Sequence, residues 1–142
     1  MATIIMIAVD FEDASRRAIE LAKELAAPLE ASLVLVHTYD LPVYTYPGLE
    51  PSVLPGFHAE VTTAARDALA ALSEEVGIAD AMLREGDPAR EILAAAHERR
   101  ATMIVMGTHG RRGLAHAILG SVAERVIRQA DLPVLTVRAE AR

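Results

Sequence analysis

Short apolar runs alternate along this chain with segments that have the spacing of amphipathic helices. The runs occupy residues 3–9, 32–37, 79–84, 102–106 and 134–137, and each is too short for a helix. Between them, apolar residues recur at helical spacing, as at Ala18, Leu21, Ala22 and Leu25. Strands that alternate with helices imply right-handed crossovers and a parallel sheet covered on both faces. The sequence therefore predicts one doubly wound, Rossmann-like α/β domain over residues 1–142, with five strands and the last strand at or near an edge.

Local signals predict where these helices begin and end. Asp13 and Ser15 are candidate caps for the first helix, and Pro28 is expected to stop it. Residues 38–58 hold four prolines, two glycines and all three tyrosines, so we expect a long loop there and a helix only after it. Gly77 is expected to end that second helix.

Composition excludes several classes of protein. The absence of cysteine rules out disulfides and thiol chemistry, and a net charge of −6 argues against a general nucleic-acid coat or a basic membrane surface. No Trp and only five Phe or Tyr residues leave little for base stacking. The first residues lack the basic start of a signal peptide, and no apolar run approaches a membrane span. We therefore expect a cytoplasmic protein with no nucleic-acid or membrane partner.

A glycine-rich segment, GTHGRRGLAHAILGS, follows the fourth predicted strand at residues 107–121. Exposed backbone N–H groups beside a helix N-terminus bind anions, and glycine lets a ligand approach the backbone. Ser121 can cap the last helix and also offer its hydroxyl to a phosphate, while Arg111 and Arg112 add positive charge. The segment lacks the Gly-Lys-Ser/Thr of a Walker loop, and the first strand–helix turn, DFEDAS, lacks the dinucleotide fingerprint. The alternative is that these glycines only shape turns.

Asp10 ends the first predicted strand. In doubly wound sheets ligands bind beyond the carboxyl ends of the strands, which here follow Val9, Val36 and Met106. A carboxylate at that place repels phosphates, so its expected partners are ribose hydroxyls or an adenine amino group. The alternative for Asp10 is a cap for the first helix.

The histidines suggest neither a metal site nor a catalytic group. His37 lies at a strand end, where a hydrogen-bonded structural role is favoured over a place at the pocket edge. His58, His97 and His116 have no partner at ligand spacing and are interpreted as surface residues. No nucleophile and base can be paired from spacing, so the chain is interpreted as a binding protein and not an enzyme.

The spacing Gly107-x2-Gly110-x9-Gly120-Ser121 resembles the ATP-binding signature of the universal stress protein family over its full length. The opening strand that ends in VD, the phrase GDPAREILAAA, and the segments ATMIVMGTHGR and LPVLTVR also resemble that family. The chain departs from it at Glu12, where many members have Ser, which bears on the cap of the first helix.

The resemblance implies an adenine nucleotide alpha hydrolase-like fold that binds ATP, with Mg²⁺ or Mn²⁺ carried by the phosphates. Asp10 would contact the adenosine end, Val9 and Val36 would flank the base, and Ser121 would add its hydroxyl to the phosphates. Backbone N–H groups of the last two signature glycines, Ser121 and Val122 would meet the phosphates. The full set implied is Val9, Asp10, Val36, Met106, Gly107, His109, Gly110, Gly120, Ser121 and Val122.

The last strand is predicted to carry a homodimer interface. It is apolar, has no internal proline and has little chain left to cover it, and such edges pair with second copies. Members of the resembled family commonly dimerise through this strand, here Val134, Leu135, Thr136 and Val137. The leading hypothesis is a nucleotide-dependent stress or regulatory protein that acts through a dimer or a partner not specified by the sequence. A slow ATPase or self-phosphorylating enzyme, and an interaction module that binds no nucleotide, are the alternatives.

Overall fold

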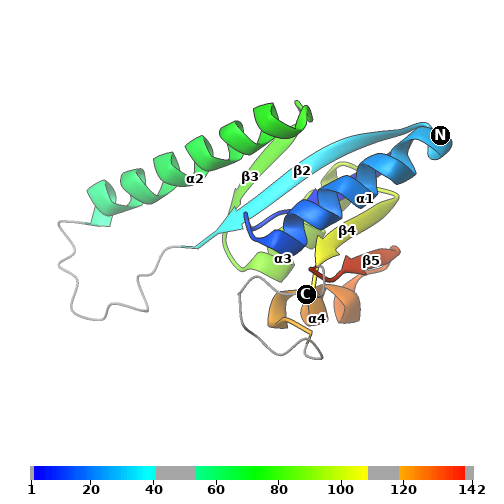
Figure 1. Cartoon of the computed structure of the whole chain (residues 1–142). Coiled ribbons are helices and arrows are strands. Elements are labelled where there is room, and N and C mark those ends of the chain that lie inside the picture. The colour runs from blue at the N-terminus through cyan, green and yellow to red at the C-terminus, as the bar shows by residue number, and fades with distance from the viewer. Residues whose placement is uncertain (1, 41–53, 109–118, 140–142) are drawn as a thin grey trace.

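Strands and helices alternate through the computed structural model, which describes residues 2–40, 54–108 and 119–139 (Figure 1). The order follows the sequence-based prediction. The elements are β1 (Thr3–Ala8), α1 (Asp13–Leu29), β2 (Ala31–Tyr39), α2 (Leu54–Val76), β3 (Ala81–Glu85), α3 (Pro88–Glu98), β4 (Met103–Gly107), α4 (Ser121–Gln129) and β5 (Val134–Val137).

The five strands form one parallel sheet in the order β3-β2-β1-β4-β5. From β1 the chain winds outward through β2 to β3, then returns to the other side of β1 for β4 and β5. The winding therefore reverses between β1 and β4, where the crossovers diverge and open a crevice at the carboxyl ends of the strands. β3 and β5 are the edge strands, so the prediction for the last strand is confirmed.

The helices cover the two faces of the sheet in pairs, as predicted. On one face α1 and α2 pack over Ile5, Ile7 and Leu35. On the other face α3 and α4 pack over Met6 and Val34. Because successive side chains of a strand point to opposite faces, the central strands must be apolar at nearly every position, which explains their continuous apolar runs.

The first helix differs from its prediction at both ends. It continues through Pro28 to Leu29 and ends where Glu30 adopts a left-handed backbone conformation, φ 50°, with its N–H on the carbonyls of the last turn. Pro28 lies in the last turn, where it removes one N–H donor and little helix follows it. The residue at the N-cap is Glu12, whose side chain makes no capping hydrogen bond, so the predicted caps Asp13 and Ser15 were both wrong.

The predicted loop over 38–58 was wrong at both ends. β2 extends to Tyr39, and α2 begins at Leu54. Pro55 lies in the first turn of α2, where a helix needs no acceptor for its N–H groups, so proline is tolerated there. Residues 41–53 of the expected loop lie outside the described residues. Gly77 follows the last residue of α2 with φ +74°, which confirms it as the terminator.

Candidate functional site

A cavity of about 420 Å³ lies at the point where the winding of the sheet reverses. Its floor is formed by the carboxyl ends of β1, β2 and β4, and its sides by the starts of α1, α3 and α4. The size falls within the range of small-molecule sites. The lining residues are Ala8, Val9, Asp10, Ser15, Val36, His37, Thr38, Pro88, Ile92, Met106, Gly107, Thr108, Gly120, Ser121, Val122 and Ala123.

The tertiary fold brings the predicted site residues together in this cavity. Those within the described part of the chain all line it: Val9, Asp10, Val36, Met106, Gly107, Gly120, Ser121 and Val122. His109 and Gly110 lie outside the described residues, as do Arg111 and Arg112. The structure therefore supports a shared location for these residues, while their contacts with a ligand stay a prediction.

The ends of β1 and β2 form an apolar wall that is held by hydrogen bonds. Val9 and Val36 are almost fully buried, and the Val9 N–H donates to the Val36 carbonyl at 2.9 Å. The Val9 carbonyl lies 2.8 Å from His37 Nδ1. A carbonyl only accepts, so Nδ1 carries the hydrogen. His37 thus has the predicted structural role and also lines the cavity. Phe11, with φ 69°, packs against it, and the centroids of the two rings lie 4.5 Å apart.

The β1–α1 turn holds the carboxylate of Asp10. Its Oδ1 accepts the Glu12 N–H at 3.0 Å and the Ser15 hydroxyl at 2.6 Å. Asp10 is exposed, whereas Ser15 is 3% exposed. Asp10 is not the N-cap of α1, so the alternative of a helix cap does not describe it. Its Oδ1 instead shapes the turn that leads into the helix.

The first turn of α4 brings three backbone N–H groups to the site. Gly120 is the N-cap, and the helix begins with the Glu124 N–H on the Gly120 carbonyl. Within the described part of the chain, the N–H groups of Ser121, Val122 and Ala123 have no acceptor, as expected for a helix start. Together with the helix dipole they form a positive end that favours an anion.

The Gly120 N–H has a partner inside the protein. It donates to the Thr108 carbonyl at 2.6 Å, and its predicted donation to a phosphate, which would require this bond to open, stays a prediction. The Gly120 φ of −63° is open to any residue, so glycine is not required there by backbone conformation. Ser121 is the first residue of α4 and not its N-cap, so the cap predicted for it is wrong.

Gly107 is required by packing. A Cβ built on it would lie 2.6 Å from Ala14 Cβ, 3.0 Å from the Ala14 carbonyl carbon and 3.2 Å from the Ser15 backbone nitrogen. The first turn of α1 therefore packs directly on the end of β4. The first glycine of the signature allows this close approach, independently of any ligand.

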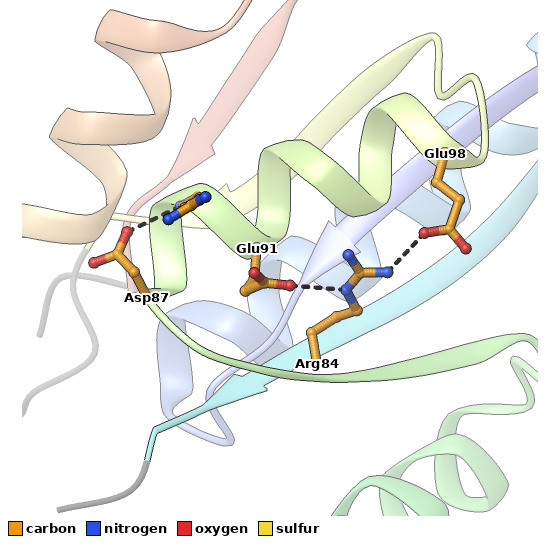
Figure 2. Close-up of polar contacts among 5 residues, drawn as sticks. Arg84, Asp87, Glu91 and Glu98 are labelled. Carbon is orange, nitrogen blue, oxygen red and sulfur yellow. Dashed lines mark hydrogen bonds and ion pairs between the residues drawn. The ribbon is translucent and has the colours of Figure 1, made fainter.

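An ion pair joins the N-cap of α3 to the second turn of α4. Asp87 is the N-cap of α3, accepts the Arg90 N–H, and forms a bidentate pair with Arg125 at two distances of 2.8 Å. The Arg125 guanidinium, followed by the Arg90 N–H, lowers the pKa of the Asp87 carboxyl. Figure 2 shows Asp87 at the start of α3, with Arg84 reaching Glu91 and Glu98 farther along that helix. These contacts hold the helices that border the cavity.

Several lining residues were not predicted from the sequence. Ser15 was interpreted as a helix cap. Pro88 and Ile92 belong to the phrase GDPAREILAAA, which resembles the family but was not assigned to the site, and they reach the cavity because α3 crosses the sheet. Ala123 could have been inferred by counting the first three N–H groups of α4. Thr108 directly follows Gly107, and its position next to a signature residue was the available signal.

The described residues contain neither a metal-binding cluster nor a membrane-spanning helix. Over 2–40, 54–108 and 119–139, no three His, Asp or Glu side chains are placed to hold a metal ion. In the same part of the chain, no helix has the length and apolar character needed to cross a membrane.

Comparison with known proteins agrees with this architecture. The model of the universal stress protein family matches residues 1–138. The chain belongs to the universal stress protein family. A universal stress protein of Thermus aquaticus is 38% identical over 139 residues, which cover 94% of this chain and 97% of that protein.

Solved universal stress protein structures share the fold. The protein UspA of Lactobacillus plantarum aligns with a TM-score of 0.76 at 25% identity, over 96% of this chain and 97% of its own. A universal stress protein solved in complex with cAMP aligns with a TM-score of 0.61 at 26% identity, over 98% of both chains. Family membership makes this chain a stress-response protein.

Proposed function

We propose that this universal stress protein binds ATP in the cavity at the ends of β1, β2 and β4, and that its bound state regulates contacts with itself or a partner. One observation carries the proposal: an apolar wall, a carboxylate and a helix N-terminus with three N–H groups border the same cavity. These three features match a base, a ribose and a phosphate chain in chemical character. No single strand or helix supplies all three.

The apolar wall is the proposed site of the adenine ring. Val9, Val36 and Met106 line the cavity from the ends of three adjacent strands, Val9 on the α1 face of the sheet and Val36 and Met106 on the α3 face. A flat aromatic ring lying against these strand ends would gain dispersion and hydrophobic contacts. Asp10, next along the chain from Val9, is the proposed partner of ribose hydroxyls or the adenine amino group, which donate hydrogen bonds. Its charge disfavours phosphates at that end and so sets the orientation of the nucleotide.

The first turn of α4 is the proposed site of the phosphates. The N–H groups of Ser121, Val122 and Ala123 would donate to phosphate oxygens, and the Ser121 hydroxyl would add a fourth donor. Mg²⁺ or Mn²⁺ is proposed to enter with the phosphates, which coordinate such hard cations through their oxygens.

The cAMP complex of a related structure supports the adenosine part of this proposal. cAMP and ATP share adenine and ribose and differ in their phosphates. The apolar wall and Asp10 would meet the shared part, whereas the first turn of α4 would distinguish the two by charge. We therefore propose ATP as the ligand and adenosine as the group that is recognised in common.

Isothermal titration with ATP, cAMP, GTP and tripolyphosphate tests the proposal. We expect ATP to bind more tightly than GTP and tripolyphosphate. Ser121→Pro gives a sharp test, because proline fits the first helical position and removes one N–H donor. Ser121→Pro also removes the hydroxyl, so Ser121→Ala, which removes the hydroxyl alone, is the matched control. Ser121→Pro should weaken ATP binding about tenfold more than Ser121→Ala does, the effect of one hydrogen bond to a charged group. A parent protein that binds none of the nucleotides would overturn the proposal.

We also propose a homodimer through the free edge of β5. The Ile104 N–H bonds to the Pro133 carbonyl and the Thr108 N–H to the Val137 carbonyl, so odd-numbered residues of β5 face β4. Backbone groups alternate along a strand, and those of Val134 and Thr136 consequently face away from the sheet. A two-fold axis would pair these groups antiparallel in an isologous contact.

A further inference from the structure

The buried hydroxyl of Ser15 makes two hydrogen bonds to Asp10. Its O–H donates to Asp10 Oδ1 at 2.6 Å, and its oxygen accepts the Asp10 N–H at 3.0 Å. Ser15 is 3% exposed, although its partner Asp10 is exposed at the cavity. A short polar side chain in the first turn of a helix usually bonds to the helix backbone. In this protein the hydroxyl serves a residue outside the helix.

The position of Ser15 is set by the neighbouring strand. Gly107, at the end of β4, has no side chain, and a Cβ there would lie 3.2 Å from the Ser15 nitrogen and 2.6 Å from Ala14 Cβ. The first turn of α1 therefore lies against β4. This contact places the Ser15 hydroxyl beside the strand end that carries Asp10.

We propose that Ser15 is the positioning residue for the Asp10 carboxylate. This inference rests on the proposed function, in which Asp10 binds the ribose hydroxyls or the adenine amino group. An exposed aspartate samples several rotamers, and binding must then restrict them at an entropic cost. Two donors on Oδ1, from Ser15 and from the Glu12 N–H, restrict the carboxylate before the ligand arrives. Oδ2 is then the oxygen that remains for a ligand donor, and preorganisation raises the affinity.

A double-mutant cycle tests this role. Ser15→Ala, Asp10→Ala and the double variant are titrated with ATP and with tripolyphosphate. We expect Ser15→Ala to weaken ATP by about two- to tenfold, the range of one hydrogen bond, and to leave tripolyphosphate binding unchanged. In the Asp10→Ala background, Ser15→Ala should have no further effect on ATP, because the residue through which it acts is gone. Additive losses, or an equal loss for tripolyphosphate, would overturn the proposal.

A matched control separates this role from general stability. Ser73 on α2 donates its hydroxyl to the Ile78 carbonyl, remote from the cavity. Ser73→Ala removes the same chemical group and one hydrogen bond, and it should leave ATP affinity unchanged. Thermal unfolding of the parent and of each variant would check that all of them are folded.

A measurement without ligand keeps the inference distinct from the proposed function. Three-bond couplings of the Asp10 side chain by NMR report whether χ1 occupies one rotamer. We expect a single rotamer in the parent and averaged couplings in Ser15→Ala. Averaged couplings in the parent would overturn the positioning role, even if ATP binds. A single rotamer that Ser15→Ala abolishes, in a protein that binds no nucleotide, would retain the positioning of Asp10 and refute its proposed ligand.

Discussion

Replacing Gly107 with alanine should destabilise the folded chain before any ligand is added. The added Cβ would lie 2.6 Å from Ala14 Cβ and 3.0 Å from the Ala14 carbonyl carbon. Neither atom is the far end of a flexible side chain, so no rotamer change relieves the overlap and α1 must move from the sheet. Overpacking of this kind costs about 1–3 kcal/mol.

A smaller effect acts in the opposite direction. Alanine restricts the unfolded chain more than glycine does, which stabilises by about 0.4–1 kcal/mol where the native backbone suits it. The net expectation is a free energy of unfolding lower by about 1–2 kcal/mol. For a chain of this length that corresponds to a fall in Tm of about 3–8 °C. Urea unfolding and calorimetry without nucleotide would measure both quantities.

Gly56→Ala is the control for the added methyl group. Gly56 lies in the first turn of α2, and a Cβ there meets nothing within 4 Å. Alanine favours the helix by up to about 1 kcal/mol relative to glycine, so this variant should be as stable as the parent or more stable. If Gly107→Ala is as stable as Gly56→Ala, the packing argument is refuted. Ala14→Gly in the Gly107→Ala background should restore part of the loss, measured as a coupling between the two sites.

Three further predictions concern the ligand, the assembly and pH. Asp10→Ala should weaken ATP binding by about tenfold in titration calorimetry, as for one lost hydrogen bond to a charged group, and should leave tripolyphosphate binding unchanged. If this variant binds ATP as tightly as the parent does, Asp10 is only a turn residue. Thr136→Pro should convert the proposed dimer to a monomer in light scattering, because proline removes an N–H group from the free edge of β5. Thr136→Val keeps that N–H group and should remain a dimer. If Thr136→Pro also remains a dimer, the interface lies elsewhere. Asp87→Asn keeps a good N-cap but loses the charge that pairs with Arg125. Because the folded-state pKa of Asp87 is lowered, its stabilisation is present above the carboxyl's unfolded pKa and is lost as pH falls through the folded value. The parent and Asp87→Asn should therefore differ in urea unfolding at pH 7 and converge once the pH has fallen below that lowered pKa. A difference independent of pH would contradict this.

The sequence by itself determined the class of fold. Short runs that are apolar at every position suit only strands buried on both faces, and their alternation with amphipathic segments leaves few topologies. Turn and helix-end signals worked where one residue decides the backbone, as at Gly77 with its φ of +74°. They failed at Pro28 and Pro55, because proline is tolerated in the last and first turns of a helix, and a local pattern does not say how far a helix extends beyond it.

Much of the candidate site was also determined by the sequence. A signature with fixed spacings, and the rule that ligands bind beyond the ends of parallel strands, selected residues that the fold gathers in one cavity. Val9, Val36 and Met106 come from three separate strands. Their common location followed from the order of strands and helices, since parallel strands end at the same edge of the sheet.

Only the tertiary structure decided what individual groups do. The Gly120 N–H bonds to the Thr108 carbonyl, the Ser15 hydroxyl bonds to Asp10, and Gly107 lacks a side chain because α1 lies against it. Each of these depends on differences of a few tenths of an ångström in the distances between residues from different elements or turns. Composition, periodicity and spacing carry no information on such distances. The distances are set only when the helices dock on the sheet and every close-packed neighbour adjusts to the others.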